Sequence, residues 1–456
     1  MRSRALASRA VYAVLACGGS WLCMACGSDS TGGGGYAGSA TAGTSSAGTS
    51  SGGTSAGGTS SADAGAGTTS GGAGNAGAND GGANDAGANS GGSAGTTGGA
   101  AKMYVADLRG YSQVPRVVTT ASGTATLMLS ADGKTLTYHV KHNVTQATKA
   151  HLHFGSAGEN GGILYPLEPL SADMTGTIAI AIASADVAAL DAGKIYVNVH
   201  SMADADGELR GQVLHAGEVL YVATLTPDQE VPPNTATSSG TATLIVDADK
   251  KSFRYHVQST LAAPTAAHIH RGLATFAGPH NHVFANLQTI DGTDTFLAGE
   301  ADDLVQGRWY VNLHTAANAN GEIRGQLLLP GETLYSALLA DTNETPPVTS
   351  GATGNAQFIL SPDQTRLRYE VALFGVTPTM AHIHNGALGV KGPVVYPLTL
   401  VPAYAGTPMA SGGAVGTQAV TAADLTALDA GYYYVNAHST AFADGATRGQ
   451  LTHPKQ

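Results

Sequence analysis

Histidines at a repeated spacing are the residues of this chain that could do chemistry. An Ala-His-apolar-His stretch occurs three times, and a Tyr-Val-Asn-x-His stretch follows each copy. The histidines are His151, His153 and His200, then His268, His270 and His314, then His382, His384 and His438. Because side chains alternate along a strand, the first two of each set share a face, with Cα atoms about 6.6 Å apart. Three neutral imidazoles with an open fourth position suit zinc or copper.

The third histidine can join the first two only if the two strands are neighbours. In the second stretch Val197 and Val199 are expected to face the core, which turns His200 to the opposite face. The alternative is structural: the imidazoles would form hydrogen bonds to Asn198 or to loop carbonyls. The sequence leaves both interpretations open.

A third phrase shows that the histidines belong to three copies of one unit. It runs Gly-Glu-x-Arg-Gly-Gln at 207–212 and 321–326, and Gly-Ala-Thr-Arg-Gly-Gln at 445–450. The three phrases recur in the same order at a period of about 115 to 125 residues, the size of a domain rather than of a solenoid unit. We expect domains at 101–215, 218–330 and 332–453, called repeats 1, 2 and 3.

Within a repeat the pattern predicts an all-β fold, with short strands joined by Gly, Asp and Asn turns. Expected strands in repeat 1 are 122–129, 135–142, 150–154, 163–167, 176–182, 194–201 and 208–214. One helix is expected from Ser184, its capping residue, to Leu190, with Gly193 ending it. Such spacing is typical of an antiparallel sandwich or barrel.

The combined phrases resemble the chordin (CHRD) domain: Glu-Val-Pro-Pro before a Gly-Thr-Ala strand, Ala-His-Ile-His, Tyr-Val-Asn-x-His, and Gly-Glu-x-Arg-Gly-Gln. The resemblance implies an immunoglobulin-like β-sandwich, an exported protein and no defined enzymatic activity. Repeat 1 departs from the family at Gln113, where the family has glutamate. The His-x-His with a later histidine is also similar, in spacing alone, to the copper site of copper/zinc superoxide dismutases.

The front of the chain reads as an export segment followed by a tether. Arg2, Arg4 and Arg9 precede short apolar runs, and residues 1–26 resemble a bacterial lipoprotein signal with Cys26 as the lipidated residue. Cys17 is the alternative site, and simple cleavage with secretion is the alternative outcome. Residues 27–100 are mostly Gly, Ala, Ser, Thr, Asn and Asp, which predicts a disordered linker.

The composition argues against several classes of function. Charged residues make up 12% of the chain and the formal net charge is -11 without a basic cluster, which argues against nucleic acid and against binding to anionic membranes. Contact with a membrane is expected only through the amino-terminal lipid. All three cysteines lie in the first 26 residues, so the repeats have neither disulfides nor thiolate sites. Recurrent Ser-His-acid sets and phosphate loops are absent, so catalysis is not favoured.

Three smaller patterns favour structural roles. His280 and His282 could add ligands in repeat 2, but exposed loop positions are favoured. The stretch 204–207 begins like a calcium loop but lacks the later glutamate, so a hairpin turn is expected. Arg210 and its counterparts Arg324 and Arg448 are expected to form an ion pair or to bond to a loop carbonyl.

The sequence therefore predicts an exported, lipid-anchored protein at the cell surface, whose three β-sandwiches are binding or structural modules for an unknown protein or surface ligand. The alternative is a copper or zinc protein with one three-histidine site per repeat and redox chemistry.

Overall fold

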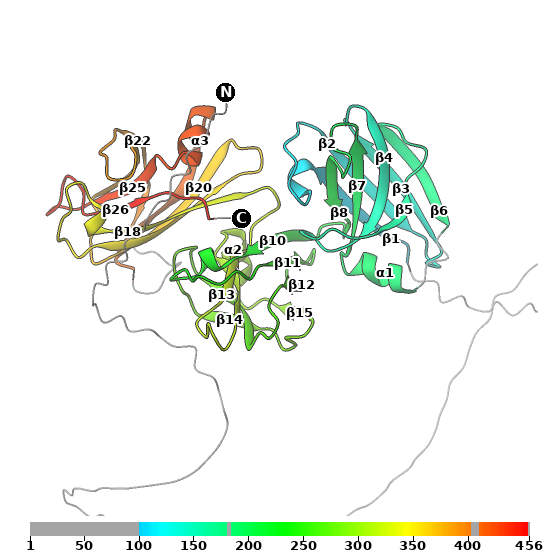
Figure 1. Cartoon of the computed structure of the whole chain (residues 1–456), viewed down its shortest axis with the longest axis horizontal. Helices are drawn as coiled ribbons and strands as arrows, with labels where there is room; N and C mark the ends of the chain where they lie inside the picture. The colour runs from blue at the N-terminus through cyan, green and yellow to red at the C-terminus, as the bar shows by residue number, and fades with distance from the viewer. Residues whose placement is uncertain (1–99, 180–183, 403–409, 455–456) are drawn as a thin grey trace, which may run out of the picture. The chain divides into compact units, whose positions relative to one another are not determined.

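The computed structural model describes residues 100–179, 184–402 and 410–454, shown as ribbons in Figure 1. Antiparallel strands are the predominant regular structure and helices are few and short, which confirms the all-β class. The predicted signal segment and nearly all of the predicted linker lie outside the described residues. Within the described ranges, no helix has the length and apolar character needed to cross a membrane.

Within the described residues, each repeat contains eight corresponding strands and one short helix, to which repeat 1 adds a short strand after the helix and repeat 3 adds one before it. Repeat 1 has β1 (Lys102–Arg109), β2 (Ser122–Leu129), β3 (Thr135–His142), β4 (Ala147–Phe154), β5 (Ile163–Pro166), β6 (Asp173–Ala179), α1 (Ser184–Asp191), β7 (Ile195–Ser201), β8 (Leu209–Gln212) and β9 (Leu214–His215). Repeat 2 has β10 (Val219–Leu225), β11 (Gly240–Val246), β12 (Ser252–Ser259), β13 (Ala266–Arg271), β14 (His280–Val283), β15 (Ile290–Thr295), α2 (Glu300–Val305), β16 (Trp309–His314) and β17 (Ile323–Gln326). Repeat 3 has β18 (Thr333–Ala340), β19 (Thr353–Leu360), β20 (Arg366–Phe374), β21 (Met380–Asn385), β22 (Val394–Pro397), β23 (Leu400–Val401), β24 (Gly412–Ala419), α3 (Ala422–Asp429), β25 (Tyr433–His438) and β26 (Thr447–Gln450). A single 3-10 turn follows the first strand of each, at Gly110–Ser112, Pro227–Gln229 and Asp341–Asn343.

Two groups of strands build each repeat. In repeat 2 they are separate sheets, with the orders β10-β11-β12-β15 and β14-β13-β16-β17. The corresponding groups in repeat 1 are joined through one residue pair of β1 and β8, Arg109 with Arg210. In repeat 3 the join is between Ala340 of β18 and Arg448 of β26. The histidine-bearing strands always belong to the second group.

Alternating polarity explains why these segments form strands. In β3, Leu136, Tyr138 and Val140 are buried, whereas the residues between them are exposed. Both strand groups contribute to one apolar core per repeat; in repeat 1, Leu127 of β2 packs in the same cluster as Val197 of β7. Burial of this apolar area is the main stabilisation available, because no cysteine lies in the repeats.

The observed strands differ from the expected ones at the first strand, β1, which was not expected, and where the chain changes partner. The expected strand 208–214 is two strands, because β8 pairs with β7 whereas β9 pairs with β1. The strand expected at 176–182 starts earlier, at Asp173, and its described part ends at Ala179. Helix α1 starts at Ser184 as expected, and Gly193, with φ +67°, follows its end.

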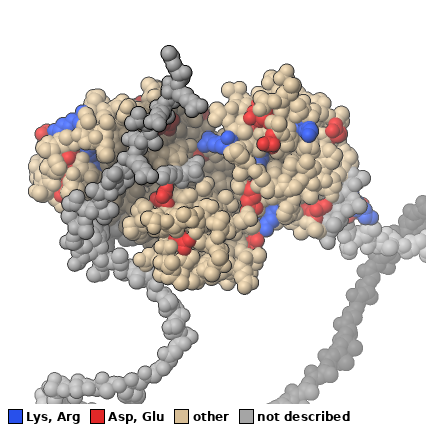
Figure 2. Space-filling view, viewed as in Figure 1, with Lys and Arg blue, Asp and Glu red and all other residues tan. Residues whose placement is uncertain are grey.

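Charged side chains are sparse on the face drawn in Figure 2, where they lie scattered among uncharged residues. This agrees with the low charged fraction of the sequence, 12%. An electrostatic footprint for nucleic acid would need clustered lysine and arginine.

Candidate metal centre

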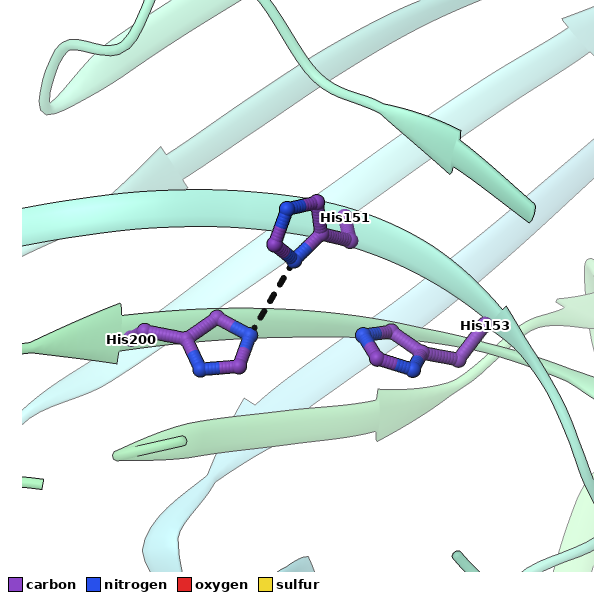
Figure 3. A group of neighbouring side chains, drawn as sticks. All are labelled: His151, His153 and His200. Atoms are coloured by element: carbon purple, nitrogen blue, oxygen red, sulfur yellow. Dashed lines mark hydrogen bonds between the residues drawn. The ribbon is translucent and has the colours of Figure 1, made fainter. Parts of the chain in front are cut away.

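Two neighbouring strands bring the three histidines of repeat 1 together. β4 pairs with β7 so that His151 lies opposite Asn198 and His153 lies opposite Tyr196. His200 is further along β7, opposite Lys149. Leu152 and Val197 point to the core, as strand alternation predicts, and the imidazoles occupy the opposite face. Figure 3 shows the three rings converging from these two strands.

The ring nitrogens are close enough to consider one shared ion. Nδ1 of His151 lies 3.2 Å from Nε2 of His200. One ligand atom from each of the three histidines lies within 4.8 Å of the others. Metal–nitrogen bonds near 2.1 Å require nitrogens about 3 to 4 Å apart. The pair of His151 and His200 meets this separation, and the remaining pairs lie within 4.8 Å.

Loop carbonyls fix the tautomers of two of these histidines. His153 donates its Nδ1–H to the carbonyl of Gly161, at 3.1 Å. His200 donates its Nδ1–H to the carbonyl of Ala205, at 2.9 Å, which gives the turn after β7 a positioning role. A carbonyl can only accept, so in both rings the lone pair is on Nε2. Ligating histidines commonly donate their other ring N–H to such a partner.

One of these lone pairs has no partner at all. Nε2 of His153 is buried and makes no hydrogen bond among the described residues. The same atom is unpartnered in the two counterparts, His270 and His384. A buried polar atom without a partner costs about 1–3 kcal/mol. The unpartnered Nε2 recurs at the same place in three repeats. It is a hydrogen-bond acceptor that is open and faces the other histidines.

A tyrosine stacks on the ring of His153, and an arginine stacks on that tyrosine. The guanidinium of Arg210 lies 3.6 Å from the ring centre of Tyr196, and Tyr196 stacks on His153 with ring centres 4.9 Å apart. Arg210 also donates to the carbonyl of Ser156 at 2.7 Å. This confirms the expected bond to a loop carbonyl and shows why arginine is needed: its planar group can stack and donate at once.

The loop that carries the accepting carbonyl approaches β4 very closely. A Cβ added at Gly161 would lie 1.4 Å from the carbonyl oxygen of Phe154. Only glycine fits there, so the residue allows its own carbonyl to reach His153. Gly278 and Gly392 have the same restriction in the other repeats.

Repeats 2 and 3 reproduce the arrangement. Nδ1 to Nε2 distances are 3.1 Å for both His268 with His314 and His382 with His438. The rings of His270 and His384 donate to Gly278 and Gly392 at 2.9 and 3.0 Å. The guanidiniums of Arg324 and Arg448 each lie 3.4 Å from a tyrosine ring centre.

Burial lowers the pKa of several of these imidazoles and so favours their neutral form. It lowers the pKa of His151 and of His268 to about 4, and that of His270 to about 3. The pKa values of His153 and His384 are lowered for the same reason. Neutral imidazole is the form that ligates a metal.

The structure thus brings together all nine histidines predicted from the sequence, as three sets of three. The structural alternative is met in part, since two rings of each set do bond to loop carbonyls. Those bonds use only Nδ1, however, and leave the Nε2 atoms turned toward the cluster. Asn198 makes no bond to these rings and accepts instead from Gln113, at 2.7 Å.

The expectation for the two additional histidines of repeat 2 is wrong, because both lie on strand β14. His282 is buried between Asp294 and Glu300, at 2.8 and 3.1 Å. His280 is exposed and stacks on His268.

Sequence reasoning missed the Arg-Tyr-His stack and the carbonyl of the close glycine. The recurrence of Tyr196, Tyr310 and Tyr434 before each third histidine, and of a glycine eight residues after each second one, was the available signal.

Comparison with known proteins agrees with this threefold pattern. A family model described as the CHRD domain matches residues 104–213, 221–327 and 335–451, well over half of the chain. The chain belongs to the CHRD domain family. Each matched segment contains one histidine cluster. Among curated proteins, chordin from Danio rerio is 35% identical over 98 residues, which cover 18% of this chain and 10% of chordin. No solved structure matches the chain significantly.

Proposed function

We propose that the chain is an exported protein whose three CHRD repeats each bind one copper or zinc ion through three histidines. In repeat 1 the ligand atoms would be Nε2 of His153, Nε2 of His200 and Nδ1 of His151. The proton that Nδ1 of His151 now donates to His200 would move to Nε2 of His151, which keeps the ring neutral and frees the Nδ1 lone pair for the ion. The observation that carries this is the buried Nε2 without a partner, which recurs in all three repeats.

The donor set narrows the choice of ion. The clusters consist of imidazoles alone, with no carboxylate or thiolate among the members found in the described residues. Magnesium and calcium prefer oxygen ligands, whereas imidazole suits zinc and copper. Three protein ligands leave a fourth position open, and copper with an open position would supply redox chemistry.

We further propose that each repeat, within 101–215, 218–330 and 332–453, is an independent immunoglobulin-like sandwich. The main apolar core of each repeat supports this, and smaller apolar clusters join repeats 2 and 3. We place the protein at the cell surface, with a lipid on Cys26 and the linker 27–100 as tether, where the repeats act as binding or structural modules for an unidentified protein or surface ligand. The amino-terminal composition and the family membership support this placement.

Metal counting on the full chain, expressed without a polyhistidine tag, tests the proposal. After chelator treatment and dialysis against copper or zinc, mass spectrometry should find about one ion per repeat. A variant in which alanine replaces the first two histidines of every set, at His151, His153, His268, His270, His382 and His384, should bind none at the sites.

Matched controls are His139→Ala and His453→Ala, because both residues are exposed and lie outside the clusters. They should leave uptake unchanged. Folded wild-type protein that takes up neither ion at neutral pH would contradict the proposal, and the histidines would then be structural.

A further inference from the structure

A fourth histidine stands beside the cluster in repeat 2 alone. Strand β14 pairs with β13 so that His280 lies opposite His270. The equivalent position is Ile163 in repeat 1, opposite His153, and Val394 in repeat 3, opposite His384. The three repeats therefore share one backbone position at the rim of the site, and only repeat 2 places a ligating side chain there.

A β-bulge turns His280 toward the cluster. His282 pairs with Ile269 and His280 with His270, so Asn281 is an extra residue between them. Without it, His280 and His282 would share a face, because side chains alternate with a period of two. The bulge separates them: His282 is buried against the core aromatics Phe253 and Trp309, whereas His280 joins the histidine face.

The ring of His280 is already in contact with the cluster. Its centre lies 4.9 Å from that of His268, with an angle of 22° between the planes, and 5.9 Å from that of His270. Its side chain is exposed and makes no hydrogen bond among the described residues. Exposed side chains change rotamer within nanoseconds, so the ring can turn toward a bound ion without backbone movement.

We propose that repeat 2 binds its ion with four histidines, His280 joining His268, His270 and His314, while repeats 1 and 3 keep an open fourth position. The inference rests on the proposed metal function, and it distinguishes the site of repeat 2 from the sites of repeats 1 and 3. Four nitrogen ligands complete the coordination of zinc or copper, so the ion of repeat 2 is retained and shielded. The three-ligand sites, rimmed by Ile163 and Val394, exchange their fourth ligand with solvent.

The test isolates one site at a time in the full chain. A chain with His153→Ala and His384→Ala retains only the site of repeat 2, and His280→Ile is then added, copying the residue of repeat 1. Competition with a chromogenic chelator gives the zinc affinity. Changes in the surroundings of a ligand already cost 10–100-fold in affinity, so loss of His280 should weaken zinc by about 10-fold or more. The copper(II) form should also lose one nitrogen from its electron paramagnetic resonance pattern.

A reciprocal variant excludes misfolding as the cause. In a chain with His268→Ala, His270→Ala and His384→Ala, which retains only the site of repeat 1, Ile163→His should tighten zinc by a similar factor.

The outcomes separate the two proposals. Equal zinc affinity with and without His280→Ile, together with no gain from Ile163→His, overturns the fourth ligand and leaves the three-histidine sites intact. Failure of both single-site parent chains to bind any ion overturns the metal function itself.

Discussion

Replacement of Glu230 by glutamine should stabilise repeat 2, and more so as the pH rises. Glu230 is 5% exposed, and Asn312 donates to its Oε2 at 3.4 Å. Oε1 of Glu230 and Oδ1 of Asn312 are both buried acceptors without partners. A protonated carboxyl would satisfy both, because Oε1–H could donate to Oδ1. Repeat 1 already has this arrangement, since Gln113 donates from Nε2 to Oδ1 of Asn198 at 2.7 Å.

The size of the effect follows from the pKa of Glu230, which burial raises from 4.5 to about 7. The folded state therefore holds this proton to a higher pH than the unfolded state does. The stabilisation that comes from this bound proton is complete below pH 4.5, declines as the pH rises to 7 and is lost above pH 7. The shift corresponds to about 3 kcal/mol at full ionisation, an upper limit because the site can relax.

Tryptophan fluorescence can follow repeat 2 alone. The chain has two tryptophans, Trp21 and the buried Trp309, so Trp21→Phe leaves a reporter in the core of repeat 2. Guanidinium unfolding at pH 5 and pH 8 gives the free energy of unfolding for this background with and without Glu230→Gln. Titration of the histidines is common to both proteins and cancels in the difference.

We expect a stabilisation below about 1 kcal/mol at pH 5 and a larger one of about 1 to 3 kcal/mol at pH 8. Asp302→Asn, at an exposed position of α2, is the control and should change little between the two pH values. If Glu230→Gln destabilises repeat 2 at pH 8, the carboxyl is ionised there and its charge is needed, which would refute the reasoning.

Three further predictions address the support of the site and the anchoring of the chain. Arg210→Lys should destabilise repeat 1 by about 1 to 3 kcal/mol in calorimetry, because lysine loses the planar stacking and the bond to the loop carbonyl; an unchanged unfolding profile would contradict the role of the stack. Gly278→Ala should abolish uptake of about one metal equivalent per chain, since the new Cβ would lie 1.6 Å from the carbonyl oxygen of Arg271; full uptake would show that the close approach is not required. Cys26→Ala should move the protein from the membrane fraction to the soluble fraction in cell fractionation, whereas Cys17→Ala should not; the reverse result would relocate the lipid.

The sequence predicted the histidine sets because two simple rules act there together. Strand alternation places His151 and His153 on one face, and recurrence in three differing contexts indicates one shared arrangement. Pairing of β4 with β7 then follows from the common core of Leu152 and Val197. These are local or nearest-neighbour properties, which a sequence pattern can express.

Other parts of the site depend on contacts that no local pattern encodes. The side of the sheet taken by His280 depends on a bulge at Asn281, because one inserted residue places His280 on the face opposite to that of His282. The pairing of Glu230 with Asn312 joins residues that are 82 positions apart in the chain. The open Nε2 of His153 is visible only once Gly161 has been placed against it.

Anomalous diffraction from crystals grown with copper or zinc tests the central claim most directly. Data on either side of the absorption edge should show one peak in each repeat, about 2.1 Å from the three ligand nitrogens. In repeat 1 these are Nε2 of His153, Nε2 of His200 and Nδ1 of His151. Empty clusters in metal-soaked crystals, with the 3.2 Å hydrogen bond between His151 and His200 retained, would contradict the account.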